Sequence, residues 1–485
     1  MNNCRERVMA CWLGKAIGGT LGMPFEGVDG PLDLHFYDPV PTEMLPNDDL
    51  DLQVVWACML DRMAEIEVNR HELAQAWLDH VDFPWDEYGV ALRNLKNGLK
   101  PPLSGSHDNW FRDGMGAPIR SEIWACLAPG QPDLAAAYAY EDACVDHADD
   151  GTWGEVFLAA LESAAFVEND PKVLLHDALS TLPDDSRVKC AVADTQNWWN
   201  ELHDWRAVRE LILQHHGHEN FTDAPMNIAF TVLGWLAGEG DFSRAICIAA
   251  NCGKDTDCTA ATVGALMGII DPDCIPQKWL APIGRDLVLS PAITGINPPD
   301  TLDGFTDLVL DLQKRLNGRW PKIPNEEQNA EHLSIDIKIG FAPSLPAADH
   351  LKLPAEMRDM ELNGTVAELA KSTFEDEFAI VEYQFILEES REVLVMFNTP
   401  QSCRVWVDGA FLLERESGVM APSFHRAPPN QSAAMYLEKG RHTLVAAVRR
   451  PADQQNAQWV VGVGEAVSKQ WIANAFSATT LSTVF

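Results

Sequence analysis

Apolar residues in the first two thirds of the chain recur with the spacing of helix faces. Val8, Cys11, Trp12 and Ala16 stand at i, i+3, i+4 and i+8, and Leu50 begins a similar series. The same periodicity predicts further helices near residues 71–81, 120–128, 133–145, 154–169, 204–216, 225–237, 241–251 and 258–266. Because no convincing run of alternating residues interrupts this region, we expect an all-α domain rather than a βαβ fold.

The pattern changes after a proline-containing stretch at residues 319–332. Beyond it, apolar and polar residues alternate, which predicts strands at 378–387, 392–398, 403–414 and 442–450. The pair Asp408-Gly409, flanked by apolar runs, is typical of a β-hairpin turn. Short strands at this spacing predict a β-sandwich. We therefore expect a multidomain chain, with an all-α domain at residues 1–325 and a β-sandwich domain at 326–485.

Composition narrows the class of protein. The chain has 485 residues, of which 46% are apolar and 22% charged, as in globular proteins and unlike disordered ones. No apolar run reaches the ~18–20 residues that span a bilayer. The mixed charges of residues 1–15 predict a helix start rather than a signal peptide. The cysteines are odd in number and set in apolar helical segments, which indicates reduced thiols and a cytoplasmic location.

The charge balance is strongly acidic. There are 72 acidic residues against 36 basic ones, a formal net charge of −36. Such a chain repels nucleic acid and anionic membranes over most of its surface, so we expect neither as a partner. Most of the acids are explained as a solubilising surface. A bound divalent cation is also compatible with this composition, because some of the acids could be its ligands.

Two segments carry paired carboxylates at corners where a loop enters a helix. Residues 45–53 contain Asp48 and Asp49, and residues 251–261 contain Asp255 and Asp257. One Asp in each corner is explained as a helix cap or a first-turn acid. Two close carboxylates repel each other unless a cation or a proton intervenes, and oxygen ligands suit Mg²⁺, Mn²⁺ or Ca²⁺. A third segment, the glycine-rich residues 14–27, ends in a turn that carries Glu26.

These three segments, in this order, resemble the ADP-ribosylglycohydrolase family, which includes the dinitrogenase-reductase-activating glycohydrolase and the ADP-ribosylhydrolases. The family pattern opens with a glycine-rich helix that ends in Glu, continues with a Thr-Asp-Asp corner and closes with a Gly-Asp-Thr-Asp-Thr/Ser corner. Residues 115–120 resemble the family's small-residue loop ending in Arg, and residues 146–166 resemble its Thr/Ser-His segment with the following helix. The resemblance covers residues 1 to about 315 and suggests a divergent branch with an added β-domain.

The resemblance implies an all-α fold with a two-metal magnesium centre, in which Mn²⁺ or Ca²⁺ could replace Mg²⁺. Asp257 would bridge the two ions. The residues that would hold the metals by this resemblance are Glu26, Asn47, Asp48, Asp49, Asp255 and Asp257, with Asp48 and Asp49 at one ion and Glu26 and Asp255 at the other.

Two residues depart from the family pattern. Asn47 stands where the family has Thr, and Cys258 stands where it has Thr or Ser. An amide oxygen can still bind a hard cation, whereas a thiol is a poor ligand for Mg²⁺. The number of metal ions, one or two, is therefore left open.

The family's reaction is the hydrolysis of a ribosyl bond to nitrogen or oxygen, through an oxocarbenium-like transition state. We expect Glu26 or Asp49 to accept the proton of the attacking water, although either could be only a ligand. Substrate contacts are expected from Trp110, Gly116, Arg120 and His147. The alternatives are core packing for Trp110, an ion pair with a helix acid for Arg120, and capping or packing for His147.

Three classes of function remain. The first is a metal-dependent glycohydrolase, for which an ADP-ribosyl conjugate is the family substrate. A glycosidase acting on another sugar conjugate is its closest alternative, since the β-domain faintly resembles the jelly-roll-like accessory domains of carbohydrate-active enzymes. The second is a non-catalytic ligand-binding member of the family, against which the retained acids argue. The third is a scaffold, which no feature of the sequence favours. The expected partners are a small-molecule, ADP-ribosylated or glycosylated substrate, and a homo-oligomer is compatible with the sequence.

Overall fold

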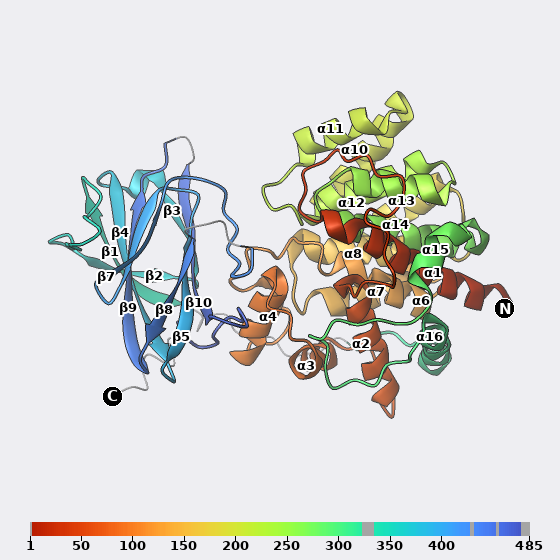
Figure 1. The fold of residues 1–485 in the computed structure, drawn as a ribbon, viewed down its shortest axis with the longest axis horizontal. Helices are drawn as coiled ribbons and strands as arrows, with labels where there is room; N and C mark the ends of the chain where they lie inside the picture. Colours follow the sequence, from red (N-terminus) through yellow and green to blue (C-terminus); the bar gives the residue numbers. More distant parts are fainter. Residues whose placement is uncertain (1, 323–333, 427–430, 453–454, 477–485) are drawn as a thin grey trace. The chain divides into compact units, whose positions relative to one another are not determined.

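The computed structural model describes residues 2–322, 334–426, 431–452 and 455–476, and the chain divides into two compact units (Figure 1). The first unit comprises the described parts of Met1–Asp82, Lys100–Ser106 and Phe111–Asn325. The second comprises Phe83–Leu99, His107–Trp110 and the described parts of Glu326–Phe485. No described helix is long and apolar enough to cross a membrane. All the cysteines are free thiols, and most are buried.

The first unit is all-helical, as the periodicity predicts. Its α-helices are α1 (Asn2–Gly22), α2 (Asp48–Arg62), α3 (Arg70–His80), α5 (Leu103–Ser106), α6 (Ser121–Leu127), α7 (Pro132–Ala143), α8 (Asp149–Ala165), α9 (Pro171–Leu179), α10 (Arg187–Leu202), α11 (Trp205–His216), α12 (Ala224–Gly238), α13 (Phe242–Asn251), α14 (Thr256–Ile270), α15 (Gln277–Ile283) and α16 (Leu302–Leu316). In the described part of this unit, three short 3₁₀ turns accompany them, η1 (Met23–Phe25), η2 (Pro118–Arg120) and η3 (Pro272–Cys274). The pattern missed α5, α9, α10, α15 and α16.

Helices α1 and α14 pack against each other along a line of glycines. A Cβ at Gly14 would lie 2.0 Å from the carbonyl oxygen of Gly264, and one at Gly18 would lie 2.1 Å from that of Ala260. One turn further, a Cβ at Gly22 would lie 2.3 Å from the Thr256 oxygen. These distances leave no room for a side chain, so the two backbones touch and the helices run antiparallel. The C-terminal end of α1, which leads to Glu26, therefore lies at the N-terminal end of α14.

The second unit contains two antiparallel sheets. Its strands are β1 (Ile335–Ala342), β2 (Arg358–Leu362), β3 (Val366–Ala370), β4 (Phe378–Leu387), β5 (Arg391–Asn398), β6 (Cys403–Val407), β7 (Ala410–Arg415), β8 (Ser432–Leu437), β9 (Gly440–Arg449) and β10 (Asn456–Glu465). The six-stranded sheet has the order β2-β1-β4-β9-β6-β7, and the four-stranded sheet has the order β3-β10-β5-β8. Alternate residues of both sheets form one apolar core, in which Tyr383 of β4 and Trp459 of β10 share a hydrogen bond. The predicted sandwich is confirmed.

The strand predictions hold where alternation is clear. The interval 378–387 coincides with β4, and 403–414 resolves into β6 and β7. Asp408 and Gly409 join them with φ angles of 50° and 79°, as a tight hairpin turn between twisted strands requires. Strands β1, β2, β3, β8 and β10 were missed.

The second unit also contains a helix from the N-terminal part of the chain, α4 (Asp86–Lys96). Its Val90 belongs to an apolar cluster with Met396, Phe424 and Trp471, and the Arg93 guanidinium lies 5.0 Å from the centre of the Trp471 ring. Nearby in the chain, the Asp108 carboxylate accepts hydrogen bonds from the Thr365 and Val366 main-chain N–H groups at 2.7 and 3.0 Å. Residues 83–99 and 107–110 thus fold with the β-sandwich. A single domain boundary at 325/326 does not account for these two segments.

Truncation after residue 325 is therefore expected to give a helical fragment in which α4 has lost its apolar partners. Val90→Ser in the full chain should cost about 2–4 kcal/mol of unfolding free energy, because the side chain is buried among apolar residues. The same substitution in the fragment should cost less than about 1 kcal/mol and raise solubility. Urea unfolding followed by circular dichroism measures both effects. An equal cost in the two backgrounds would show that α4 packs independently of the β-sandwich.

Candidate metal centre

The first acidic corner is the N-terminus of α2. Asn47 caps this helix, since its Oδ1 accepts the main-chain N–H of Asp49 at 2.9 Å. Asp48 and Asp49 follow in the first turn, where the helix dipole favours negative charge. The side chain of Asp49 is buried and that of Asp48 is half-buried. The cap thus turns Asp49 into the protein interior.

The second corner is the N-terminus of α14, and it is fixed directly to the end of α1. The Thr256 hydroxyl donates a hydrogen bond to the Gly22 main-chain oxygen at 2.8 Å. The Gly27 main-chain N–H donates to the Lys254 oxygen at 2.9 Å, so the turn that carries Glu26 is bound to the loop before Asp255. Gly253 enters this loop at a φ of 77°, a conformation that favours glycine.

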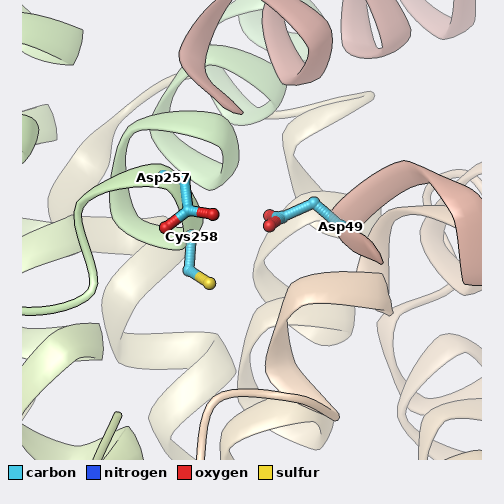
Figure 2. A group of neighbouring side chains, drawn as sticks. All are labelled: Asp49, Asp257 and Cys258. Atoms are coloured by element: carbon cyan, nitrogen blue, oxygen red, sulfur yellow. The ribbon is translucent and has the colours of Figure 1, made fainter. Parts of the chain in front are cut away.

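The corners bring two groups of potential ligands together, and Asp257 belongs to both. Glu26, Asp255 and Asp257 form the first group, and Asp49, Asp257 and Cys258 form the second. Within each group, one ligand atom of every residue lies within 4.8 Å of those of the others. Figure 2 shows the carboxyl groups of Asp49 and Asp257 facing each other, with the Cys258 side chain beside them. Asp48 lies outside both groups.

The first group fits a divalent cation. Burial raises the pKa of the Asp257 carboxyl well above its usual range, and the neighbouring Glu26, Asp255 and Asp49 carboxyls raise it further. The Asp257 Oδ1 atom is buried and has no hydrogen bond within the described part of the chain. Carboxylate oxygens at this spacing are the ligands that Mg²⁺, Mn²⁺ and Ca²⁺ prefer. A cation would offset the repulsion among the three acids and satisfy the buried oxygen.

The second group has a different environment, because a buried lysine of α1 reaches it. The Lys15 Nζ atom lies 2.9 Å from Asp49 Oδ1 and 2.8 Å from Glu122 Oε1. Burial opposes the charged form of Lys15, but the Asp49 and Glu122 carboxylates outweigh burial and raise the pKa of the ammonium above its ordinary value. Burial also raises the pKa of the Cys258 thiol well above its usual range, with the surrounding acids adding to the effect. Cys258 is therefore a neutral thiol.

Arg120, expected as a substrate contact, is completely buried. Its Nε donates to Asp142 Oδ2 at 3.0 Å, and its Nη1 donates to the Gly116 main-chain oxygen at 2.8 Å and to Asp146 Oδ2 at 3.0 Å. Its Nη2 donates to Asp146 Oδ1 at 2.5 Å. The guanidinium thus binds acids of its own unit, which favours the ion-pair interpretation.

His147 and Gly116 belong to the same buried network. The His147 Nε2 atom accepts the Ala117 main-chain N–H at 3.3 Å, so the imidazole is not protonated at that nitrogen, and its Nδ1 lies 3.2 Å from Asp146 Oδ1. Both side chain and loop are buried. The histidine thereby holds the small-residue loop at 115–120 in place, a packing role that we considered as the alternative to substrate contact.

Trp110, the remaining substrate candidate, belongs to the other unit. It packs against the apolar cluster of Val90, Met420 and Trp471. Its proposed stacking on a base or sugar stays a prediction.

Three residues of the site were not recognised in the sequence. They are Lys15, Glu122 and Gln53, and Gln53 Nε2 donates to Glu122 Oε2 at 2.8 Å and to the Asp49 main-chain oxygen at 2.7 Å. A lysine inside an otherwise apolar, glycine-rich helix was the available signal. Its partners could not be identified, because Glu122 lies 107 residues away in the chain.

Comparison with known proteins identifies the family. The ADP-ribosylglycohydrolase family profile matches residues 1–316, well over half of the chain. No curated protein matches the sequence. Among solved structures, an ADP-ribosylglycohydrolase-related protein complex is 19% identical with a TM-score of 0.46, over 65% of this chain and 99% of its own.

Two structures of β-glucosidase from Kluyveromyces marxianus, one selenomethionine-labelled and one in complex with glucose, also match. They are 11% and 13% identical, with TM-scores of 0.21 and 0.19, and each match covers 27% of this chain and 16% of theirs. Likenesses this weak carry no argument about function. The family profile, in contrast, matches most of the helical unit. Together with the helical fold and the two acidic corners, this match shows that the chain belongs to the ADP-ribosylglycohydrolase family.

Proposed function

We propose that the chain is a divalent-metal-dependent glycohydrolase that cleaves a ribosyl bond, with an ADP-ribosyl conjugate as the substrate class. The observation that carries this proposal is the convergence of Glu26, Asp255 and Asp257 within 4.8 Å, inside a unit of a glycohydrolase family. A divalent ion held there would supply a Lewis acid for the sugar hydroxyls and a site for water. Arg120 has no substrate role in this proposal, because its guanidinium binds Asp142 and Asp146 within the protein.

Between the two candidates for the proton acceptor, the environment favours Glu26. Its side chain is exposed, so a water and a substrate can reach it. The Asp49 side chain is only 1% exposed, and its Oδ1 already forms an ion pair with Lys15. This carboxylate is engaged by a buried ammonium, and its burial keeps a substrate from reaching it. We therefore assign proton acceptance to Glu26 and a positioning role to Asp49.

Glu26→Gln is expected to lower kcat by about 10²–10⁴-fold, the range for loss of a general base. The assay follows release of ADP-ribose from ADP-ribosyl-arginine and ADP-ribosyl-serine, and release of base from nucleosides, with Mg²⁺ or with EDTA. Glu43→Gln, at an exposed acid outside both ligand groups, is the matched control and should keep full activity. Undiminished hydrolysis by the Glu26 variant, or by the wild type in EDTA, would contradict the proposed function.

A further inference from the structure

The second ligand group contains a cation that belongs to the protein. Lys15 is completely buried, and its ammonium lies 2.9 Å from one oxygen of Asp49. Glu122 and Thr262 hold the ammonium from the other side, at 2.8 and 3.4 Å. Gln53 in turn donates to Glu122, so the position of the ammonium is fixed by several contacts. Asp49 thus already has a positive partner in the folded protein.

Asn47 presents its amide Nδ2, a hydrogen-bond donor, to this group and not a ligand oxygen. Its Oδ1 accepts the Asp49 main-chain N–H at 2.9 Å, and its Nδ2 donates to Asp257 Oδ2 at 3.3 Å. The orientation of the amide is fixed by its two neighbours, because the N–H requires an acceptor and the carboxylate requires a donor. The residue that replaces the family's threonine therefore uses its oxygen to cap α2.

This second group offers fewer protein oxygen ligands than the first group does. Asp49 Oδ2 and Asp257 Oδ1 are buried oxygens without hydrogen bonds in the described chain, and the third member of the group is the thiol of Cys258. Mg²⁺ requires near-octahedral oxygen coordination, and Ca²⁺ takes six to eight oxygens. Sulfur is a soft ligand and a poor substitute for oxygen at a hard cation. An ion at this place would also face the ammonium already bound to Asp49.

We propose that Lys15 replaces the second metal ion, so that the centre holds a single divalent cation, bound by Glu26, Asp255 and Asp257. This inference rests on the proposed function, since it presupposes the first ion. Three residues act together: Lys15 neutralises Asp49, Asn47 donates to Asp257, and Cys258 offers sulfur where the family pattern has a hydroxyl oxygen. The positive charge at Asp49 is then permanent, whereas the first cation remains exchangeable.

The test counts bound ions with Mn²⁺ as the probe, by equilibrium dialysis and electron paramagnetic resonance on the full chain. We expect one Mn²⁺ per chain, with the spectrum of an isolated ion. Two ions per wild-type chain, with the spectrum of a coupled pair, would overturn the proposal and leave the proposed function intact. No bound Mn²⁺ would overturn both, because the proposed function requires the first ion. This measurement on the wild-type chain tests the proposal even if a variant of Lys15 does not fold.

Two variants then test the role of Lys15 in setting the number of bound ions. Asn47→Thr with Cys258→Thr restores the family's hydroxyls but keeps Lys15, so it should still bind one Mn²⁺. Adding Lys15→Leu to that pair removes the ammonium and should raise the count to two. One ion in the folded triple variant would overturn the role of Lys15. Lys189→Met, which removes a lysine paired with Asp184 elsewhere in the unit, is the matched control and should bind one ion like the wild type.

Discussion

Replacing Asp257 by asparagine is expected to abolish divalent-cation binding and hydrolysis while leaving the metal-free protein at least as stable as the wild type. Asp257 belongs to both ligand groups, so no other residue can substitute for it. In the absence of metal, however, its buried carboxylate lies beside Glu26, Asp255 and Asp49, whose charges repel it. Asparagine keeps the shape of the side chain and removes that repulsion.

Thermal and urea unfolding with and without Mg²⁺ measure both effects. At a free Mg²⁺ concentration of about 100 times Kd, binding should stabilise the wild type by about 2.7 kcal/mol and the variant not at all. In EDTA, the variant should be as stable as the wild type or more stable. Asp133→Asn, at an exposed acid in the first turn of α7, should behave like the wild type in both buffers. Wild-type Mg²⁺ affinity in Asp257→Asn would refute the metal assignment.

The pH dependence of the metal-free protein gives a second check. A carboxyl whose pKa is raised in the folded state binds a proton more tightly there than in the unfolded chain. Its contribution to stability is therefore present at low pH and is lost as the pH rises through the folded pKa. In EDTA, the advantage of Asp257→Asn over the wild type should be largest at neutral pH and should shrink as the pH falls.

The acidic corners could be predicted because their signals are local. An Asn cap followed by acids before an apolar series marks a helix start, and this pattern placed Asp48 and Asp49 at the entry of α2. The spacing of Gly14, Gly18 and Gly22 is typical of a close helix contact, although it does not identify α14 as the partner. The hairpin at Asp408-Gly409 was likewise predicted from a short stretch of sequence. Local patterns determined these features without knowledge of the tertiary fold.

The features that were missed depend on residues far apart in the chain. Helix α4 has its apolar partners among residues 396–471, so no pattern near residue 90 could assign it to the β-sandwich. Lys15 lies in a buried ion pair whose acids come from α2 and α6. The sequence analysis treated the lysine only as part of the glycine-rich segment. Buried charges of this kind become interpretable only when their partners are known, because an unpaired charge would not be buried.

Arg120→Met is expected to destabilise the helical unit by about 3–5 kcal/mol, the cost of removing one member of a buried ion pair. Asp142 and Asp146 would remain in the interior without their cation. Against the effect of burial, Arg120 and His147 lower the pKa of Asp146 to about 2. Without the arginine, that pKa should rise. Urea unfolding at pH 7 measures the loss, and Arg244→Met, at an exposed pair with Glu239, should cost about 0–1 kcal/mol.

The companion variant distinguishes a structural arginine from one that binds substrate. If Arg120 serves only the buried network, adding Asp146→Asn to Arg120→Met should recover part of the lost stability, because it removes an orphaned carboxylate. The wild type should also lose stability as the pH falls from about 4 through 2, because the pKa of Asp146 is lowered in the folded state; Arg120→Met should lose less over the same interval. A variant with wild-type stability and a raised KM would instead place the guanidinium on the substrate, against the contacts that bury it.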